Sequence, residues 1–417
     1  KIFIINCYSQ MFKKRAIFFI RSSAGELEWV LPIMNQMKAE GFLVSLYYLS
    51  VRGLNSCNLN STCVEVLNHM AVESKLLFGT NLFLIQSYKI LDVFYRASSK
   101  FGSLFVTDIF QIFIKNIFLY FLKLFKGLPR CEYAFLEYPH DKSLFAACLR
   151  GGIVSKKIFY FPHSPHISSP ANRPIKAELF LEQFNSNIKE VYLLGSKEDI
   201  SNLNKKLLTY RKSKVLIIGH PKLSKDWTSY LKSIFLSSFK KKGLTVAILS
   251  RGIGNFIDKD EQKYLCETTA LALVNNLKVQ KVFLKYHPRE IVNTFWEEFN
   301  HHKFCKTTMS VAELLQNVDF IIGFWTSAAL DSYVFGVPFI EFYRPDLCSI
   351  GQVKNKGNFK TIYEVSNLVH SAKDKTELIK IIDMATKGEL NLTEGTFMLN
   401  DIFKASDKWW DTFKQAL

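Results

Sequence analysis

The chain has 417 residues, 48% of them hydrophobic, and its formal net charge is +17. At about 100–200 residues per domain this length predicts two domains, and the apolar fraction excludes a disordered chain. The positive charge indicates an anionic partner, such as nucleic acid, anionic lipid or an acidic glycan. Because the basic residues are mostly scattered lysines, without an Arg-rich arm or a recognition module, nucleic-acid binding is disfavoured.

The eight cysteines form no CxxC pair and no Cys/His group with zinc spacing, so we expect reduced, mostly buried thiols. The start of the chain has no convincing secretory signal, which favours a cytoplasmic protein. The most apolar stretch, residues 101–125, is interrupted by polar side chains and is a poor candidate for a spanning helix. We interpret it as one or two core helices, and the alternative is an amphipathic helix on the inner membrane surface.

In the first half of the chain, short apolar runs alternate with amphipathic stretches, which is typical of βαβ units and a parallel sheet. A helix is expected near residues 28–40. Strands are expected at residues 16–20, 42–49, 133–136, 157–161, 191–194 and 214–218. This series predicts a first Rossmann-like domain over residues 1–222.

A polar, basic stretch then predicts a linker at residues 223–243. The second series of strands is expected at residues 245–249, 280–286, 319–322 and 338–343. It predicts a second Rossmann-like domain over residues 244–396, with a central cleft between the two domains. The tail, residues 397–417, contains two tryptophans, and we expect it to pack back on the first domain.

Ligands of open parallel sheets bind at the carboxyl ends of the strands, so polar residues that follow strands are the candidates for a site. Lys285, His287 and Arg289 end one predicted strand of the second half. An imidazole beside cationic side chains suits a phosphate group. The structural alternative is a solvated strand end.

The next predicted strand of the second half is followed by a glycine turn and a helix start at Thr326 and Ser327. Hydroxyls and free backbone N–H groups at a helix start form an anion site, although Ser and Thr there are also ordinary caps. Glu341 follows in the next strand. Its carboxylate could accept hydrogen bonds from both ribose hydroxyls, and the alternative is a surface Glu.

In the first half, Glu26 lies at the predicted helix start after the first strand, where it could act as a general base or favour the helix dipole. His163 follows a later strand and is a second catalytic candidate, and Glu137 lies in a similar strand-end loop. In the second half, Arg251 and Asn255 could reach a donor phosphate or sugar.

Together these motifs resemble bacterial GT-B glycosyltransferases that use CMP-activated acidic sugars. The His-Pro motif at residues 287–288 and the Thr-Ser pair at 326–327 are similar to the pair that binds CMP in bacterial sialyltransferases and Kdo transferases. The stretch Ser22–Glu26 looks like the SxGE element of the lipid A Kdo transferases, whose Glu is the proposed base. The second half also resembles the retaining β-Kdo transferases of capsule and lipopolysaccharide assembly. The whole chain is covered only at the level of element order.

This resemblance implies that His287, Thr326 and Ser327 hold the CMP phosphate and that Glu341 holds the ribose. It also implies that Glu26 lies near the acceptor or the reacting carbon.

The retaining enzymes have an Asp nucleophile, which we would place in the loop after the second half's first strand. This chain offers Asn255 there. Either Asp226 or Asp258 supplies the nucleophile, or the chain carries an Asp-to-Asn change, or the enzyme inverts. The stereochemistry therefore stays open at the level of sequence.

The sequence thus predicts an α/β protein of the GT-B type that moves Kdo from CMP-Kdo to a lipopolysaccharide or capsular glycan. Cationic side chains and a helix start can neutralise the CMP leaving group, and no DxD-like metal motif stands out, so we expect transfer without a metal or cofactor. The expected partners are a nucleotide sugar, a glycan or lipid-linked glycan acceptor and the inner membrane surface, but not nucleic acid. The alternatives are a CDP-glycerol-type polyol-phosphate transferase, a UDP-sugar glycosyltransferase or epimerase, and a non-catalytic assembly module.

Overall fold

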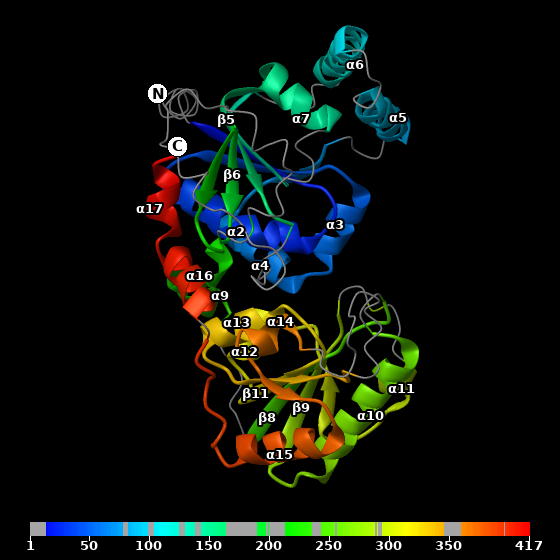
Figure 1. The fold of residues 1–417 in the computed structure, drawn as a ribbon, viewed down its shortest axis with the longest axis vertical. Coiled ribbons are helices and arrows are strands. Elements are labelled where there is room, and N and C mark those ends of the chain that lie inside the picture. Colours follow the sequence, from blue (N-terminus) through cyan, green and yellow to red (C-terminus); the bar gives the residue numbers. More distant parts are fainter. Residues whose placement is uncertain are drawn as a thin grey trace, which may run out of the picture. The chain divides into compact units, whose positions relative to one another are not determined.

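The computed structural model divides the chain into two compact units (Figure 1). The first unit comprises residues 1–58, 63–222 and 405–417, and the second comprises residues 59–62 and 223–404. The structure describes residues 14–77, 82–98, 104–124, 130–137, 143–163, 190–196, 199, 213–235, 243–254, 257–287, 290, 294–345, 360–395 and 397–417.

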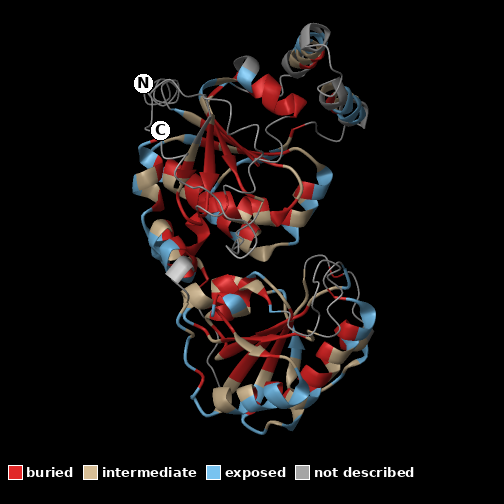
Figure 2. Ribbon diagram, in the orientation of Figure 1, coloured by how far each residue is buried: buried red, intermediate tan, exposed pale blue. Residues whose placement is uncertain are grey.

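The first unit is built on a parallel sheet in which seven strands are described, in the order β3-β2-β1-β4-β5-β6-β7. These strands are β1 (Arg15–Ile20), β2 (Leu43–Tyr48), β3 (Ser74–Leu76), β4 (Cys131–Glu137), β5 (Val154–Phe161), β6 (Glu190–Leu194) and β7 (Ser213–Ile217). The inner strand β1 is buried on both faces, as parallel sheets require when helices cover both sides (Figure 2).

The helices of the first unit are α2 (Ala24–Ala39), α3 (Val51–Asn58), most of α4 (Ser61–Met70), α5 (Leu82–Ser98), α6 (Leu104–Leu124) and α7 (Leu144–Cys148). One face of the sheet packs against α6 and α7, since Ile17 and Phe19 of β1 share an apolar cluster with Ile114 and Phe118 of α6. Residues 149–153 form a π-helical turn between α7 and β5.

The other face of this sheet carries a row of aromatic rings, and it receives the end of the chain. Phe18 stacks on Phe135 with ring centroids 4.1 Å apart, and Phe135 stacks on Phe159 at 4.9 Å. Phe413 of α17 (Trp409–Lys414) lies 5.0 Å from the Phe159 ring. The Tyr133 hydroxyl also donates to the Leu417 carbonyl oxygen at 2.7 Å. Ring packing and a hydrogen bond from a side chain to the backbone therefore hold residues 405–417 on the first unit.

The second unit is built on a parallel sheet with six described strands, in the order β10-β9-β8-β11-β12-β13. They are β8 (Leu244–Leu249), β9 (Val279–Lys285), β10 (Phe304–Lys306), β11 (Phe320–Gly323), β12 (Phe339–Phe342) and β13 (His370–Ala372). The helices are α9 (Lys225–Ile234), α10 (Lys259–Asn275), α11 (Thr294–Glu298), α12 (Val311–Leu315), α13 (Ala328–Phe335), α14 (Ile362–Val365), α15 (Lys375–Thr386) and most of α16 (Phe397–Asp407). Side chains of α10 and α15 complete its apolar core.

One stretch differs from the sequence expectation, and a second agrees with it. Residues 225–234, expected within a linker, form helix α9, which begins at the Ser224 cap and contacts α12 and α13. Trp227 and Leu231 are buried there. Although basic residues surround them in the sequence, these apolar side chains pack α9 into the second unit. Within the apolar stretch at 101–125, Leu104–Leu124 form α6, whose Ile114 and Phe118 enter the core, as expected for a core helix.

Candidate functional site

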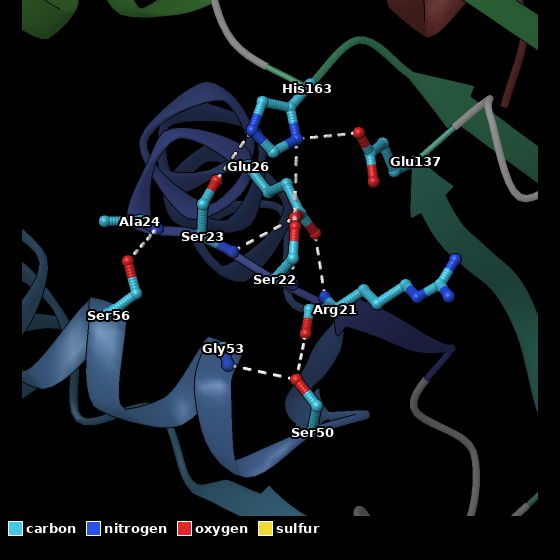
Figure 3. Close-up of polar contacts among 10 residues, drawn as sticks. All are labelled: Arg21, Ser22, Ser23, Ala24, Glu26, Ser50, Gly53, Ser56, Glu137 and His163. Carbon is cyan, nitrogen blue, oxygen red and sulfur yellow. Dashed lines mark hydrogen bonds and ion pairs between the residues drawn. The ribbon is translucent and has the colours of Figure 1, made fainter. Parts of the chain in front are cut away.

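The strand ends of the first unit bring together a serine, a histidine and two glutamates (Figure 3). Strands β1, β4 and β5 are neighbours in the sheet, so the residues that follow them meet at one edge. Glu26 lies in the first turn of α2, after β1. Glu137 is the last residue of β4, and His163 follows β5 by two positions.

His163 is the centre of this group. Its Nδ1 lies 2.7 Å from Glu137 Oε1 and 3.5 Å from Glu26 Oε1, and its Nε2 lies 3.1 Å from Ser23 Oγ. A carboxylate accepts hydrogen bonds but cannot donate them, so we assign the proton of the neutral ring to Nδ1. Nε2 then carries the free electron pair and accepts a hydrogen bond from the Ser23 hydroxyl.

Exposure separates the three ionisable groups. The His163 side chain is 43% exposed, whereas those of Glu26 and Glu137 are 0% and 5% exposed. Solvent or a substrate can therefore reach the imidazole but not the Glu26 carboxylate. Of the two catalytic candidates described in this unit, His163 has the access that proton transfer to a bound molecule requires.

Glu26 is committed to the turn between β1 and α2. Its Oε1 accepts from the backbone N–H groups of Ser22 at 2.9 Å and Ser23 at 3.1 Å, and from the Ser22 hydroxyl at 2.6 Å. Its Oε2 accepts from the Arg21 N–H at 2.7 Å. This carboxylate satisfies N–H groups that otherwise have no helical partner, as the N3 glutamate of a capping box does. The Glu26 that the sequence marked as a candidate base thus holds the turn and faces His163.

The electrostatics of Glu26 follow from this burial. Desolvation raises the pKa of the Glu26 carboxyl above its ordinary value, and the nearby charge of Glu137 raises it further. The hydrogen bonds from Ser22 and Arg21 and the charge of His163 oppose that shift in the pKa. A positive charge on His163 would therefore be favoured by both carboxylates, which is what a proton-accepting imidazole needs.

Helix α3 supports the same turn from outside. The Ser50 hydroxyl donates to the Arg21 carbonyl oxygen and accepts from the Gly53 N–H at 3.0 Å. A Cβ atom at Gly53 would lie 2.7 Å from that carbonyl oxygen, so only glycine permits this approach. Ser56 caps the other side of the turn by accepting from the Ala24 N–H at 3.1 Å. The sequence analysis did not single out these small residues.

In the part of the chain that the structure describes, one group of side chains is close enough to hold a metal ion. It consists of Glu26, Glu137 and His163, with ligand atoms within 4.8 Å of one another. Glu26 already accepts four hydrogen bonds, and the positive end of the α2 dipole points at it. Both features favour a network of hydrogen bonds over a cation at this position.

The second unit places its predicted site residues at the carboxyl edge of its sheet. Arg251 follows β8, Lys285 ends β9 and His287 follows it, and the loops are joined because the Ser250 N–H donates to the Lys285 carbonyl oxygen at 2.9 Å. Glu290 ties these loops more firmly. Its carboxylate accepts from the Ser250 hydroxyl at 2.8 Å and from the His287 N–H at 3.2 Å.

The Lys285 ammonium donates to the Met309 carbonyl oxygen at 2.6 Å, so it holds the loop before α12. Residues 255 and 289, where the sequence analysis placed Asn255 and Arg289, lie outside the described residues. The alternative nucleophiles are both exposed. Asp258 caps α10 by accepting from the Glu261 N–H at 2.8 Å, and Asp226 lies in the first turn of α9.

Thr326 and Ser327 lie at the start of α13, as the sequence indicated. Thr326 Oγ1 accepts from the Ala328 N–H at 3.3 Å, whereas the exposed Ser327 side chain makes no capping hydrogen bond. The preceding Trp325 has φ of 46°, which is a left-handed backbone conformation. This conformation is energetically unfavourable for a residue with a large side chain, and such residues often occur in functional turns. Because β8 alone separates β9 from β11, two strand spacings or about 10 Å divide the ends that lead to His287 and Thr326.

Glu341 is fully buried inside β12. Its Oε2 accepts from the Thr361 hydroxyl, while Oε1 has no hydrogen-bond partner among the described residues. Burial raises the pKa of Glu341 to about 8, and the charge of Arg251 and the Thr361 hydrogen bond oppose that rise. The sequence alternative of a surface Glu is therefore wrong.

The comparisons with known proteins concern the fold. No protein-family model matches the chain, and no curated protein sequence matches it. The solved structures that resemble it include UDP-GlcNAc 2-epimerase from Methanocaldococcus jannaschii, with a TM-score of 0.53 and 12% identity, covering 97% of this chain and 99% of that one. A putative UDP-N-acetylglucosamine 2-epimerase from Listeria monocytogenes has a TM-score of 0.52 and 9% identity, covering 97% of this chain and 96% of that one.

A third similar structure, UDP-GlcNAc 2-epimerase from Neisseria meningitidis bound to UDP-GlcNAc, has a TM-score of 0.50 and 8% identity, covering 96% of this chain and 100% of that one. These three proteins are enzymes of UDP-sugars, and none of them is a CMP-Kdo transferase. At such low identity the likeness extends to the fold and no further. The chain has the two Rossmann-like parallel-sheet units of the GT-B fold, which confirms the fold class predicted from the sequence.

Proposed function

We propose that the chain is a UDP-sugar-dependent glycosyltransferase whose base is His163. The observation that carries this proposal is the exposed imidazole with Nδ1 held by Glu137 at 2.7 Å. The GT-B fold and its UDP-sugar-binding neighbours support a nucleotide-sugar substrate. They favour a UDP-sugar donor over the CMP-Kdo donor that the motifs suggested. CMP-Kdo is therefore included in the test as the competing donor.

In the proposed reaction His163 Nε2 takes the proton of an acceptor hydroxyl. The acceptor oxygen forms a bond to the anomeric carbon of the sugar, and the bond between that carbon and the phosphate oxygen breaks. UDP leaves with the electron pair of that bond. The resulting imidazolium lies 2.7 Å and 3.5 Å from two carboxylates, which stabilise its charge.

The neighbours of His163 have distinct supporting roles in this proposal. Glu137 fixes the tautomer in which Nδ1 carries the proton, and Glu26 positions the turn that carries Ser23. The Ser23 hydroxyl is hydrogen-bonded to Nε2 at 3.1 Å. An acceptor hydroxyl either replaces the Ser23 hydroxyl there or passes its proton to Nε2 through the Ser23 hydroxyl. Small shifts of the turn would change the direction in which Nε2 points. Glu26 therefore positions the turn and takes no part in proton transfer.

The second unit is the proposed site for the nucleotide. Thr326 and the N-terminus of α13 suit a phosphate, as do Arg251 and His287 at the neighbouring strand ends. These groups are cations and hydrogen-bond donors that can neutralise a diphosphate, and we propose that transfer needs no divalent metal.

The test is turnover of a panel of sugar nucleotides in the presence of a mixed glycan acceptor pool. UDP-GlcNAc, UDP-glucose, CMP-Kdo and CDP-glycerol are supplied separately to the wild-type chain, to His163→Gln and to the exposed control His69→Gln. Transfer to glycan with release of UDP, lost in His163→Gln and retained in the control, is the expected result. Release of CMP from CMP-Kdo alone, or unchanged turnover in His163→Gln, would reject the proposal.

A UDP-GlcNAc 2-epimerase is the second candidate, because the structures with a TM-score of at least 0.5 include several enzymes of that name. In that reaction no acceptor is needed, and a base removes the proton at C2 of the sugar. Incubation of UDP-GlcNAc alone in deuterated water separates the two candidates. An epimerase incorporates deuterium at C2 without an acceptor, whereas a glycosyltransferase leaves C2 unlabelled.

A further inference from the structure

Helices α5 and α6 of the first unit expose apolar side chains. Figure 2 colours the described parts of both helices partly as exposed. On α5 these are Ile90, Val93 and Phe94, each more than half exposed. On α6 they include Ile112, Phe113 and Tyr120, also each more than half exposed. The two helices pack against each other, so their outward faces form one apolar surface, the α5–α6 face. Contiguous exposed apolar surface of this kind marks an interaction site.

The inward faces of the same helices fix which side points out. Ile114 and Phe118 of α6 enter the core cluster of the first unit. On α5, the buried Asp92 accepts a hydrogen bond from the Leu144 N–H at 2.9 Å, which ties α5 to the start of α7. The exposed side chains therefore cannot turn inward without breaking this packing.

The segment of the chain that contains both helices carries a strongly one-sided charge. Residues 82–130 contain seven Lys and Arg against two Asp and no Glu, a net charge of 7 − 2 = +5. Lys89 is exposed on α5 beside Ile90, and Lys115 is partly exposed on α6. Asp92, one of the two acidic residues, is buried and bonded within the protein. Apolar side chains with interspersed cations suit the boundary of an anionic lipid layer.

We propose that the α5–α6 face binds the surface of an anionic lipid membrane. No helix among the described residues is long and apolar enough to cross a membrane. Insertion would therefore be shallow, with aromatic rings at the depth of the headgroups and lysines paired with lipid phosphates. A second copy of the chain is the less favoured occupant, because two surfaces with the same positive charge repel each other. The proposal does not depend on the sugar nucleotide or on the reaction.

Flotation with lipid vesicles tests the proposal directly. The chain is mixed with vesicles of phosphatidylcholine alone, or of phosphatidylcholine with phosphatidylglycerol, at low and high salt. Binding to the phosphatidylglycerol vesicles that weakens with salt is expected. The double variant Phe94→Glu, Phe113→Glu should bind at least about tenfold more weakly, since it removes two apolar anchors and adds two negative charges.

The matched control is Leu277→Glu, which changes an 86% exposed apolar residue of the second unit. It should bind vesicles as the wild type does. Equal melting temperatures in all three proteins would show that folding is intact. The proposal is overturned if the wild type does not bind anionic vesicles, or if the control loses binding as the double variant does. It is also overturned if the double variant abolishes a dimer in size-exclusion chromatography while vesicle binding is absent.

Discussion

Glu26→Gln distinguishes a residue that positions the turn from one that moves the proton. The carboxylate accepts three backbone N–H groups and one hydroxyl, shared between its two oxygens. A glutamine has one acceptor oxygen, so its amide nitrogen must face at least one of these N–H donors. Leaving a buried N–H without an acceptor costs about 1–3 kcal/mol. Because the pKa of Glu26 is already raised by burial, loss of its charge recovers part of that cost.

The expected result is therefore a loss of about 1–2 kcal/mol in the free energy of unfolding, a fall in melting temperature of roughly 2–8 °C. The rate constant kcat should fall by less than about tenfold, against about 10²–10⁴-fold for His163→Gln. Urea unfolding and steady-state kinetics measure the two quantities, and the exposed Glu65→Gln serves as the control. A Glu26→Gln variant with wild-type stability and the kcat of His163→Gln would refute this reasoning, since Glu26 would then be the base.

Three further predictions follow from the same contacts. Glu137→Gln removes the charge 2.7 Å from His163 Nδ1, and kcat should fall about 10–100-fold with little change in KM, whereas an unchanged kcat would disprove the role of Glu137. The pKa of Glu341 rises from 4.5 to about 8 on folding, so the folded state holds the extra proton and the free energy of unfolding falls by up to about 1.4 kcal/mol per pH unit as pH rises through that window. Glu341→Gln should flatten this dependence in urea titrations, and an unaltered slope would contradict it. EDTA should leave turnover and melting temperature unchanged, and a loss restored by Mn²⁺ would show that a metal is needed.

The strand ends were the part of the site that the sequence could indicate. Glu26, His163 and His287 each follow an apolar run, and within each of the two parallel sheets such positions share one edge. That pattern, however, does not specify which strands are neighbours. Glu137 and His163 meet because β4 and β5 pair, which depends on contacts between residues far apart in the chain.

The sequence could not show which of these side chains are buried, because burial depends on contacts that form only in the folded chain. From the sequence, Glu26 at a helix start could equally be a base, a partner of the helix dipole or a cap. Its role as a cap depends on three N–H groups that converge on it in the folded turn. Glu341 reads as a strand-end carboxylate, but its burial depends on Thr361 and the strands beside it. Helix α9 was missed because its apolar residues are spaced among lysines and serines that resemble a linker.

The central claim is that the chain binds a uridine nucleotide, and a melting-temperature comparison with UDP and CMP tests it most directly. At a concentration about 100 times its dissociation constant, a ligand of the folded state stabilises it by about 2.7 kcal/mol. UDP is therefore expected to raise the melting temperature by roughly 5–10 °C, with little effect of CMP. A rise with CMP and none with UDP, or no rise with either, would contradict the account.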